Sequence, residues 1–590
     1  MTDEVSAAWV ARKHTSYDEL TSVGGALWWL QSDPDLEGAR RLVRMAPDSV
    51  PQAQTPPDVS VGGWLHAYGG GSYAVGPDCQ WIVSAIDSKV YRIGRQSSPQ
   101  CVVPREDDFL YGDLHLVPEG LLAVRGTEDG DEIVSIGHGD TAVQVLISST
   151  GFLASPRVRG GLLAYLEWDA DRMPWDSSRL RIAEYRAGAA DSASELVAGG
   201  VYESVIQPSW GPDGSLYFLS DRTGWWNLYR WNGPIHAVAP LAADCAPAPW
   251  EGGYQSYAFL PGGGIALTVL DGFRTRLITV EPGGSQTELK TELTSLKPYI
   301  TAHGAELAVI GSTPFSSPSV RMLNPTERTR RTEDETSAAH RPQVAGPSVH
   351  ETRQGHAVRY VLHLPSSRNS AMPTPLLVRA HPGPTDDVPL RLDWTVQFFT
   401  SRGFAVAEVA YRGSTGQGRE FRQALHGHWG EYDVEDCVLV AEQLLADGVA
   451  LPGAVFITGA SAGGYTALQA ACLRGPFTAA TATSAIIDPE RWTRTAPRFQ
   501  RPHAAILAGP AGPIQAGRIS VPVLLIHGTT DAVAPVSDAV ELADQLAADA
   551  KDHQTLILDG VGHYLSDPAS LQAALEAELA FYNRFIPAAG

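Results

Sequence analysis

A short stretch between Ala454 and Leu473 constrains the fold of this chain more than any other. Its first part, Ala454 to Thr458, is apolar and β-prone, and helix-forming residues resume at Tyr465. Between them lies Gly-Ala-Ser-Ala-Gly, with Ser461 at the centre. Between a strand and a helix, this pattern places the serine on a strained turn whose glycines let strand and helix approach closely. The context favours a catalytic serine over a glycine-rich loop that contains an ordinary one.

The length and charge of the chain limit its fold and its partners. At 590 residues the chain is too long for one core, so two large domains are expected. Apolar residues make up 44% of the sequence, which is enough for cores of ordinary size. The net charge of −22 argues against binding to nucleic acid and to anionic membrane surfaces.

Cysteine usage and hydropathy indicate the compartment. The five cysteines are scattered and show neither metal-ligand spacing nor a disulfide framework, as expected for thiols in a reducing compartment. The N-terminal segment lacks the apolar region of a secretory signal, and no apolar run approaches a membrane span. We therefore expect a cytoplasmic protein without a metal or organic cofactor. A homo-oligomer is compatible with these features.

Residues 25–330 show a repeating antiparallel texture. Short β-prone runs alternate with glycine, proline and aspartate turns, most clearly from Pro208 to Trp231. Similar Pro/Gly turns precede the runs that begin at Leu121 and Ile265. Repeats of about 40–45 residues predict a β-propeller of about seven blades. A large β-sandwich is the alternative.

The rest of the chain divides into an extension, a linker and a second domain. Residues 1–24 are expected to form an N-terminal extension that could pack on the second domain. The polar, charged stretch that ends at Pro347 predicts a linker over 331–347. Residues 348–590 alternate strands and helices, which predicts an α/β-hydrolase domain with a doubly wound, mostly parallel sheet. Functional residues in such sheets gather at the carboxyl ends of strands.

Two residues after Ser461 complete a candidate catalytic triad. A serine becomes a strong nucleophile when a histidine takes its proton and a carboxylate orients that histidine. In an α/β-hydrolase sheet the acid and then the base follow the serine along the chain. Asp531 follows the predicted strand Val523–Ile526, and His563 follows the predicted strand Leu556–Leu558. We therefore predict the triad Ser461, Asp531 and His563.

Other residues compete for two of these roles. His527 lies nearer to its strand end than Asp531 does, and we interpret it as a structural histidine. Asp538 and Asp559 are alternative acids, although Asp538 begins a predicted helix and suits the charge preference there. His553 lies in a polar stretch and is expected to face solvent.

Acyl transfer also needs hydrogen-bond donors for the developing oxyanion. The N–H of Ala462 is one candidate because it follows the nucleophile. The second is expected in the loop after the predicted strand Pro375–Ala380, which reads His-Pro-Gly-Pro. Pro382 has no N–H, so Gly383 is the predicted donor. A tight turn without a chemical role is the alternative.

Taken together, these motifs resemble the prolyl oligopeptidase family of serine peptidases, especially its acylaminoacyl-peptidase and dipeptidyl-aminopeptidase-like branch. The residues that carry the resemblance are His381–Pro384, Tyr411–Arg419, Gly459–Tyr465, His527–Asp531, Gly562–His563, Leu575–Phe585 and, in the first domain, Ala164–Asp176 and Trp210–Arg230. The resemblance implies a propeller of seven or eight blades that caps the hydrolase domain. It also implies that the propeller limits access to the active site, so that the substrates are short peptides or peptide-like amides. The oxyanion donors of the family correspond to Ala462 and Gly383.

The resemblance also implies residues for substrate binding. A free amino terminus needs a carboxylate for its ammonium group, and Ala67 departs from a propeller motif that usually has a glutamate there. Glu167 is the remaining candidate, with a blade-stabilising carboxylate as the alternative. His381 stands where some branches use a tyrosine hydroxyl. Residues that either line an apolar acyl-side pocket or belong to the core are Ile487, Trp492 and Val533.

The leading hypothesis is a serine peptidase that hydrolyses short peptides or aminoacyl amides through an acyl-enzyme intermediate. The alternative keeps the triad but makes the protein an amidase, esterase or acyltransferase for a small peptide-like metabolite. A third hypothesis is a binding protein whose hydrolase domain is a relict. A complete triad argues against it.

Overall fold

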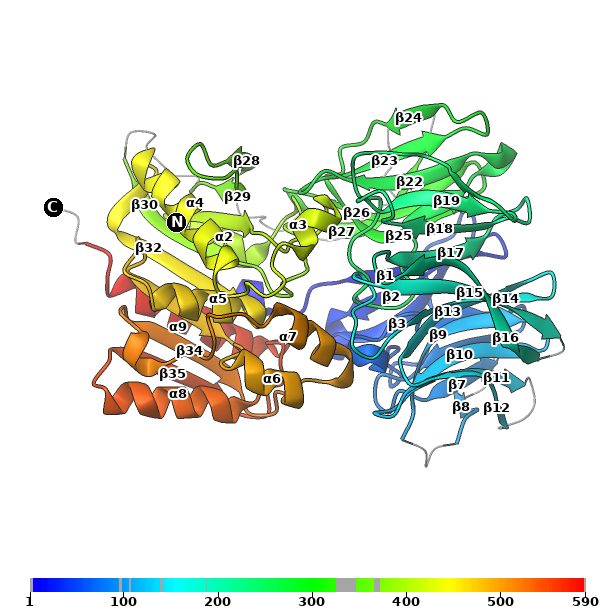
Figure 1. Ribbon diagram of the computed structural model, residues 1–590, viewed down its shortest axis with the longest axis horizontal. Coiled ribbons are helices and arrows are strands. Elements are labelled where there is room, and N and C mark those ends of the chain that lie inside the picture. The colour runs from blue at the N-terminus through cyan, green and yellow to red at the C-terminus, as the bar shows by residue number, and fades with distance from the viewer. Residues whose placement is uncertain are drawn as a thin grey trace.

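The computed structural model describes residues 4–94, 98–104, 108–137, 142–186, 188–324, 346–365 and 372–587. Figure 1 shows two domains next to each other, one of small sheets and one built on a single large sheet with helices. Of the predicted linker, residues 331–345 lie outside the described residues.

The N-terminal domain is a β-propeller, as predicted from the sequence, and its described residues form seven antiparallel sheets of consecutive strands (Figure 1). The first three sheets comprise β1 (Tyr17–Val23), β2 (Ala26–Asp33), β3 (Ala39–Met45), β4 (Gln52–Ala53), β5 (Tyr73–Val75), β6 (Cys79–Val83), β7 (Val90–Gly94), β8 (Gln100–Cys101), β9 (Leu110–Val117), β10 (Gly120–Gly126), β11 (Asp131–Gly137) and β12 (Val143–Ser149). The other four comprise β13 (Phe152–Arg159), β14 (Leu162–Trp168), β15 (Ser178–Arg186), β16 (Ala189–Gly200), β17 (Val205–Trp210), β18 (Leu216–Ser220), β19 (Asn227–Trp231), β20 (Ile235–Ala237), β21 (Tyr257–Phe259), β22 (Ile265–Leu270), β23 (Thr275–Val280), β24 (Gln286–Leu289), β25 (Ser295–His303), β26 (Glu306–Thr313) and β27 (Ser316–Leu323).

The fifth blade shows how the sequence forms these sheets. Strand β18 reads Leu-Tyr-Phe-Leu-Ser and is buried on both faces. Phe218 on one face packs in a cluster with residues of the fourth blade, and Leu219 on the other face packs in a cluster with residues of the sixth. The turn before it ends at Gly214, whose φ of 84° is left-handed and suits a residue without a side chain. The same pattern, a Pro/Gly turn followed by an apolar strand, explains why the repeat could be recognised from the sequence.

The first and last blades close the ring by packing. Each sheet uses its own consecutive strands, so no strand is shared between them. Instead, Leu20 and Trp29 of the first sheet join Tyr299 and Ile310 of the last sheet in one buried cluster. Burial of apolar surface therefore holds the two ends of the propeller together.

The propeller begins with β1, earlier than the boundary predicted at residue 25. The charged residues Asp18 and Glu19 hide the strand pattern of β1. Glu19 is nevertheless buried, and it accepts hydrogen bonds from the backbone and hydroxyl of Ser72 at 2.7 Å each. Before β1, helix α1 (Ala7–Ala11) packs against the last helix of the hydrolase domain through residues such as Val10.

The C-terminal domain contains one mixed sheet of eight strands, in the order β28-β29-β31-β30-β32-β33-β34-β35. The strands are β28 (Pro347–Glu351), β29 (Arg359–His363), β30 (Thr374–Ala380), β31 (Ala405–Ala410), β32 (Ala450–Ala460), β33 (Ala479–Thr483), β34 (Val523–Gly528) and β35 (His553–Leu558). All pairs from β31 to β35 are parallel, and only the pairs of β29 are antiparallel. This is the doubly wound α/β-hydrolase sheet that the sequence predicts.

Helices cover both faces of this sheet. They are α2 (Trp394–Thr400), α3 (Gly418–Gln423), α4 (Tyr432–Ala446), α5 (Ala462–Ala471), α6 (Pro489–Thr495), α7 (Arg501–Leu507), α8 (Val536–Ala548) and α9 (Pro568–Asn583). Short 3₁₀ turns occur at Pro34–Leu36, Leu65–Ala67, Pro261–Gly263, Arg498–Gln500 and Ala516–Arg518.

Helices α4, α5 and α8 share one buried cluster with alternate strand residues such as Ile457. Helices α1, α2 and α9 share the cluster on the other face with the intervening residues, such as Phe456.

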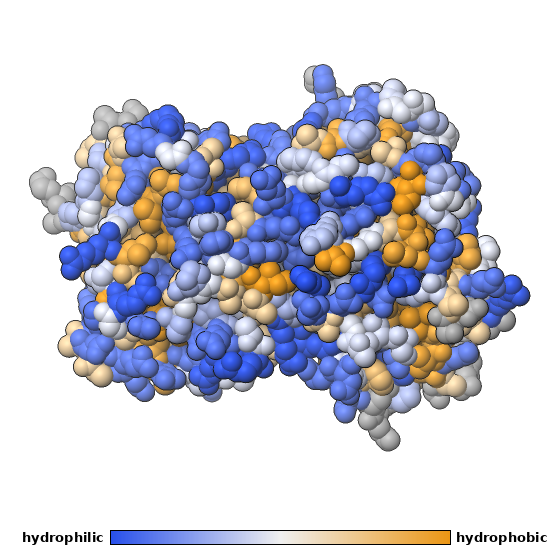
Figure 2. All heavy atoms as spheres, viewed as in Figure 1, coloured by the Kyte–Doolittle hydropathy of each residue, from blue (hydrophilic) through white to orange (hydrophobic). Residues whose placement is uncertain are grey.

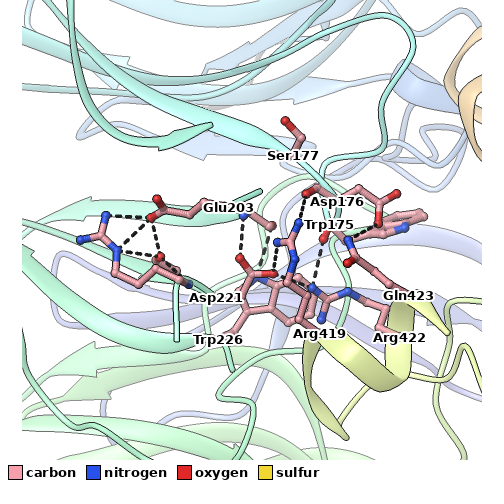
Figure 3. A network of polar contacts seen from close by, with 12 residues as sticks. Trp175, Asp176, Ser177, Glu203, Asp221, Trp226, Arg419, Arg422 and Gln423 are labelled. Atoms are coloured by element: carbon pink, nitrogen blue, oxygen red, sulfur yellow. Dashed lines mark hydrogen bonds and ion pairs between the residues drawn. The ribbon is translucent and has the colours of Figure 1, made fainter. Parts of the chain in front are cut away.

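Helix α3 joins the two domains by charge (Figure 3). Arg422 and Arg419 donate to the same carboxylate oxygen of Asp221 in the propeller, at 2.6 and 2.7 Å. The guanidinium of Arg422 also lies 3.9 Å from the ring centroid of Trp226. A second contact links the 3₁₀ turn after α6 to the propeller, where Arg498 lies 2.7 Å from Asp131.

Figure 2 shows that hydrophilic residues cover much of this face on both domains, with patches of hydrophobic residues between them. Among the described helices, none is long and apolar enough to cross a membrane.

Candidate active site

Ser461 lies at the sharp turn between β32 and α5. Its backbone has φ 53° and ψ −118°, a strained conformation for a residue with a side chain. The neighbouring glycines are required because a larger residue at these positions would clash with the backbone. A Cβ at Gly459 would lie 2.1 Å from the carbonyl oxygen of Gly463, and a Cβ at Gly463 would lie 2.3 Å from that of Ala380. The turn therefore holds the serine at the carboxyl edge of the sheet, as its sequence pattern predicts.

The three residues of the predicted triad meet at this edge. His563 Nε2 lies 3.0 Å from the hydroxyl oxygen of Ser461. His563 Nδ1 lies 2.8 Å from one carboxylate oxygen of Asp531 and 3.0 Å from the other. These distances allow His563 to take a proton from Ser461 while Asp531 orients the imidazole ring.

Asp531 is held as an anion. Its side chain is inaccessible to solvent, and one oxygen accepts backbone N–H bonds from Val533 at 2.8 Å and Ala534 at 2.9 Å. Burial alone would raise the pKa of Asp531, but hydrogen bonds from His527 and His563 outweigh burial and keep that pKa well below its usual range. The carboxylate is therefore ionised at neutral pH.

The competing residues lie in other contacts. His527 is buried, and its Nε2 lies 2.9 Å from the carbonyl of Ala534 and 3.3 Å from Asp531. Asp538 pairs with Arg491 at 2.9 Å, and Asp559 accepts a hydrogen bond from Thr529 at 3.2 Å. None of these contacts reaches the hydroxyl of Ser461.

The loop after β30 lies beside the Ser461 turn. Gly383 has a φ of 121°, which a glycine adopts without strain. The loop is fixed from behind because the hydroxyl of Tyr411 donates to the carbonyl of His381 at 2.7 Å. The close approach of Gly463 to that same carbonyl places the loop beside the first turn of α5, where Ala462 has its N–H. The roles of Ala462 and Gly383 as oxyanion donors stay predictions.

His381 is engaged within this loop. Its ring stacks on Tyr411 with centroids 4.1 Å apart, and its Nε2 lies 2.7 Å from the hydroxyl of Ser414. Its Nδ1 lies 2.8 Å from the carbonyl of Pro382. Burial lowers the pKa of His381 to about 4, so the ring is neutral at pH 7. These contacts make His381 a support for the loop.

The three candidate pocket residues come together beside the triad. Trp492 donates its indole N–H to the carbonyl of Val533 at 3.0 Å, two residues after Asp531. Ile487 and Trp492 are buried in the same cluster, with Val533 packed against it. The role of these three residues in an acyl-side pocket stays a prediction.

Glu167 lies in an ion-pair cluster of the fourth blade. It contacts Arg181 at 2.7 Å and Arg179 at 3.6 Å, both on the neighbouring strand β15. These contacts match the blade-stabilising alternative, and they provide no support for a role in binding a substrate ammonium group.

One group of described residues has metal-ligand spacing, namely His356, Glu435 and Asp436. Arg412 donates to Asp436 at 2.8 Å and to Glu435 at 2.5 Å. A cation therefore already balances these carboxylates, and the arrangement is that of an ion-pair network.

Sequence reasoning missed two acidic residues near the site, Asp386 and Asp387. They follow the His-Pro-Gly-Pro loop and line a cavity of about 410 Å³ that also contains His563. The signal available in the sequence was a pair of acids three and four residues after Gly383.

The fold and the site together define a class of protein, a propeller-capped α/β-hydrolase with a nucleophile-elbow serine. Residues 390–588 match the sequence model of the prolyl oligopeptidase family. This match confirms the resemblance that the motifs indicated.

Known proteins with similar chains are peptidases and a puromycin hydrolase. A puromycin-hydrolyzing peptidase of Mycobacterium tuberculosis is 29% identical with a TM-score of 0.91, and the alignment covers 99% of this chain and 97% of that one. A puromycin hydrolase is 27% identical with a TM-score of 0.92, over 98% and 96% of the two chains. The acylamino-acid-releasing enzyme of Arabidopsis thaliana is 24% identical over 37% of this chain and 31% of its own length. The chain thus aligns with about a third of this curated relative.

Proposed function

We propose that this protein is a serine peptidase that hydrolyses short peptides or aminoacyl amides through an acyl-enzyme intermediate. The observation that carries the proposal is the hydrogen-bonded chain from Ser461 through His563 to Asp531, set on a strained elbow. A serine linked by hydrogen bonds to a histidine, which is linked in turn to a carboxylate, has the arrangement of a catalytic triad.

The chemistry follows from these contacts. His563 Nε2 takes the hydroxyl proton as Ser461 attacks the substrate carbonyl carbon, and Asp531 stabilises the imidazolium that forms. The N–H groups of Ala462 and Gly383 receive the negative charge on the carbonyl oxygen. His563 then gives its proton to the leaving amine, and a water activated by the same histidine releases the acyl group from Ser461.

The substrate class rests on the propeller and on the similar proteins. The propeller contacts the hydrolase domain at α3 and near α6. We infer from these contacts that the propeller admits only small substrates to the active site. The similar structures are named for puromycin hydrolysis, and the curated relatives are named as acylamino-acid-releasing enzymes and dipeptidyl aminopeptidases. These names favour amide substrates over the esterase or acyltransferase alternative. A cytoplasmic location without a nucleic-acid or membrane partner remains a proposal from composition.

The test compares the wild-type protein with a Ser461→Ala variant on puromycin and on amides of single amino acids and dipeptides. We expect wild-type turnover and a loss of kcat of several orders of magnitude in the variant. Ser537→Ala, at an exposed serine in the first turn of α8, is the matched control and should retain full activity. Full activity of Ser461→Ala would refute the mechanism, and wild-type turnover of simple esters alone would favour the alternative.

A further inference from the structure

The segment that carries helices α6 and α7 enters the propeller at one turn. Figure 1 shows both helices on the side of the hydrolase domain that faces the propeller, and the 3₁₀ turn Arg498–Gln500 connects them. Buried residues on either side of this turn, such as Trp492, Ala496 and Leu507, belong to the core of the hydrolase domain. Phe499 instead belongs to a buried cluster whose other described members all lie in the propeller.

Aromatic rings of the propeller surround Phe499, which is 3% exposed. The imidazole ring of His66 stacks on the ring of Phe499, with 5.5 Å between the centroids. Four more rings meet it edge-on at 5.7 to 6.5 Å, those of Tyr68, Phe152, Trp168 and Trp175. We call these five propeller residues the Phe499 socket. Because aromatic rings attract each other in these geometries, the socket fixes the position of the turn.

Hydrogen bonds on both sides of the buried ring hold the turn in the socket. Arg498 donates to the carboxylate of Asp131 at 2.7 Å and also to the backbone carbonyl of Gly151. The carboxylate of Asp131 is inaccessible to solvent. On the other side, the side-chain amide of Gln500 donates to the hydroxyl of Tyr68. Three consecutive residues of the hydrolase domain are thus bound by the propeller.

Two loops that meet across the centre of the propeller brace this socket. One loop precedes β5 and contains Tyr68, and the other precedes β21 and contains Trp250, whose ring lies 5.1 Å from that of Tyr68. Strand β5 belongs to the second blade and β21 to the sixth, so the loops come from opposite sides of the ring. The N–H of Gly252 donates to the carbonyl of Gly69 at 2.8 Å, and Gly70 pairs with Gly252 in a parallel bridge. The position of the socket is therefore set by the whole propeller.

The same segment of the hydrolase domain holds the loop of the catalytic acid. Trp492, in helix α6, donates its indole N–H to the carbonyl of Val533 at 3.0 Å. This carbonyl belongs to the peptide group between Val533 and Ala534, and the N–H of that group donates to Asp531 at 2.9 Å. Because a peptide group is planar and rigid, the indole of Trp492 fixes the direction of the N–H that binds the carboxylate.

We propose that Phe499 is a positioning residue for the hydrolysis reaction. Anchored in the propeller, it sets the place of α6 and, through Trp492, the orientation of Asp531. The inference rests on the proposed function, because Asp531 is the acid of the triad that acts at Ser461. It gives the propeller a second role besides limiting access, since the domain that covers the active site also holds part of it in place.

The test compares full-length wild type with Phe499→Ala on an aminoacyl amide. The values of kcat and KM are measured separately, per mole of Ser461 that a fluorophosphonate labels at completion. We expect kcat to fall about 10- to 100-fold while KM stays within about threefold of wild type, because a small displacement of a catalytic group lowers the rate of the chemical step. The matched control is Phe218→Ala, at a buried ring in another cluster of the propeller, and it should leave kcat unchanged.

A double-mutant cycle distinguishes positioning from a loss of stability. Trp492→Phe removes the indole N–H and should lower kcat by itself. If Phe499 acts through that hydrogen bond, the double variant loses no more than the larger of the two single effects. Phe499→Leu keeps apolar bulk but loses the ring contacts, and it replaces Phe499→Ala in the cycle if that variant fails to fold. We expect it to show a smaller loss of kcat with the same lack of additivity.

Other outcomes separate this proposal from the proposed function. Unchanged kcat in Phe499→Ala, equal losses in Phe499→Ala and Phe218→Ala, or losses that multiply in the double variant overturn the positioning role and leave the peptidase intact. A wild type that hydrolyses no amide, with Ser461 unreactive toward the fluorophosphonate, overturns the peptidase and the positioning role together.

Discussion

Replacing Asp221 by alanine should weaken the junction between the two domains. Asp221 and Arg422 are both inaccessible to solvent, and the carboxylate also accepts a bond from Arg419, which is 14% exposed. The other oxygen of Asp221 accepts the backbone N–H of Ser204 at 2.7 Å. Removal of Asp221 therefore leaves a buried guanidinium without its carboxylate and a buried N–H without its acceptor.

The expected loss follows from this burial. Removing one partner of a buried ion pair costs about 3–5 kcal/mol, because the remaining charge stays away from water. An exposed pair in the same protein gives the scale for comparison. Glu184 and Arg186 are 61% and 83% exposed in their side chains, and such surface pairs contribute about 0–1 kcal/mol. Asp221→Ala should thus destabilise the protein several times more than Glu184→Ala.

Urea denaturation followed by tryptophan fluorescence measures this difference, since Trp226 contacts Arg422. The double variant Asp221→Ala/Arg422→Met is a control in which the second substitution should shift stability in the opposite direction from Asp221→Ala alone. It removes both charges and should recover much of the loss, because apolar replacements of a buried ion pair are often neutral. Equal effects of Asp221→Ala and Glu184→Ala, or a double variant worse than the sum of its parts, would refute the reasoning.

Three further predictions concern the site and the first blade. Gly463→Ala should lower kcat about 100-fold, because its Cβ would meet the carbonyl of Ala380 at 2.3 Å, whereas Gly475→Ala meets nothing within 4 Å and should be neutral in the same assay. Asp531→Asn should lower kcat about 10⁴-fold while circular dichroism and thermal stability stay close to wild type, and a loss under tenfold would contradict its assigned role. Burial raises the pKa of Glu19 from 4.5 to about 7, so its neutral form stabilises the fold at low pH and this contribution is lost as the pH rises through about 7. Glu19→Gln should therefore gain melting temperature relative to wild type between pH 4.5 and 7, and a constant difference across this range would contradict the shift.

The parts of the fold that could be predicted from the sequence are those with a local signal. The elbow at Ser461 combines a β-prone run, glycines at fixed offsets and a helix, each readable from neighbouring residues. The order of Asp531 and His563 after that elbow follows from the topology of the sheet. The blades were visible because turn residues and apolar strands repeat along the chain.

The parts that could not be predicted depend on contacts distant in sequence. Strand β1 was missed because Glu19 reads as an exposed acid, and only Ser72 of the next blade explains its burial. Glu167 could not be distinguished from a substrate ligand until Arg181 was placed beside it on β15. Phe499 of the hydrolase domain lies in a cluster of propeller residues, so no local pattern describes its surroundings.

The central claim is that Ser461 is the nucleophile that carries the acyl group. Mass spectrometry of peptides after treatment with a fluorophosphonate tests it most directly, with amide hydrolysis measured on the same samples. We predict one adduct per chain, on Ser461, with activity lost in proportion to labelling and no adduct in Ser461→Ala. Full activity with Ser461 blocked, or an adduct on another serine that tracks the loss of activity, would contradict the account.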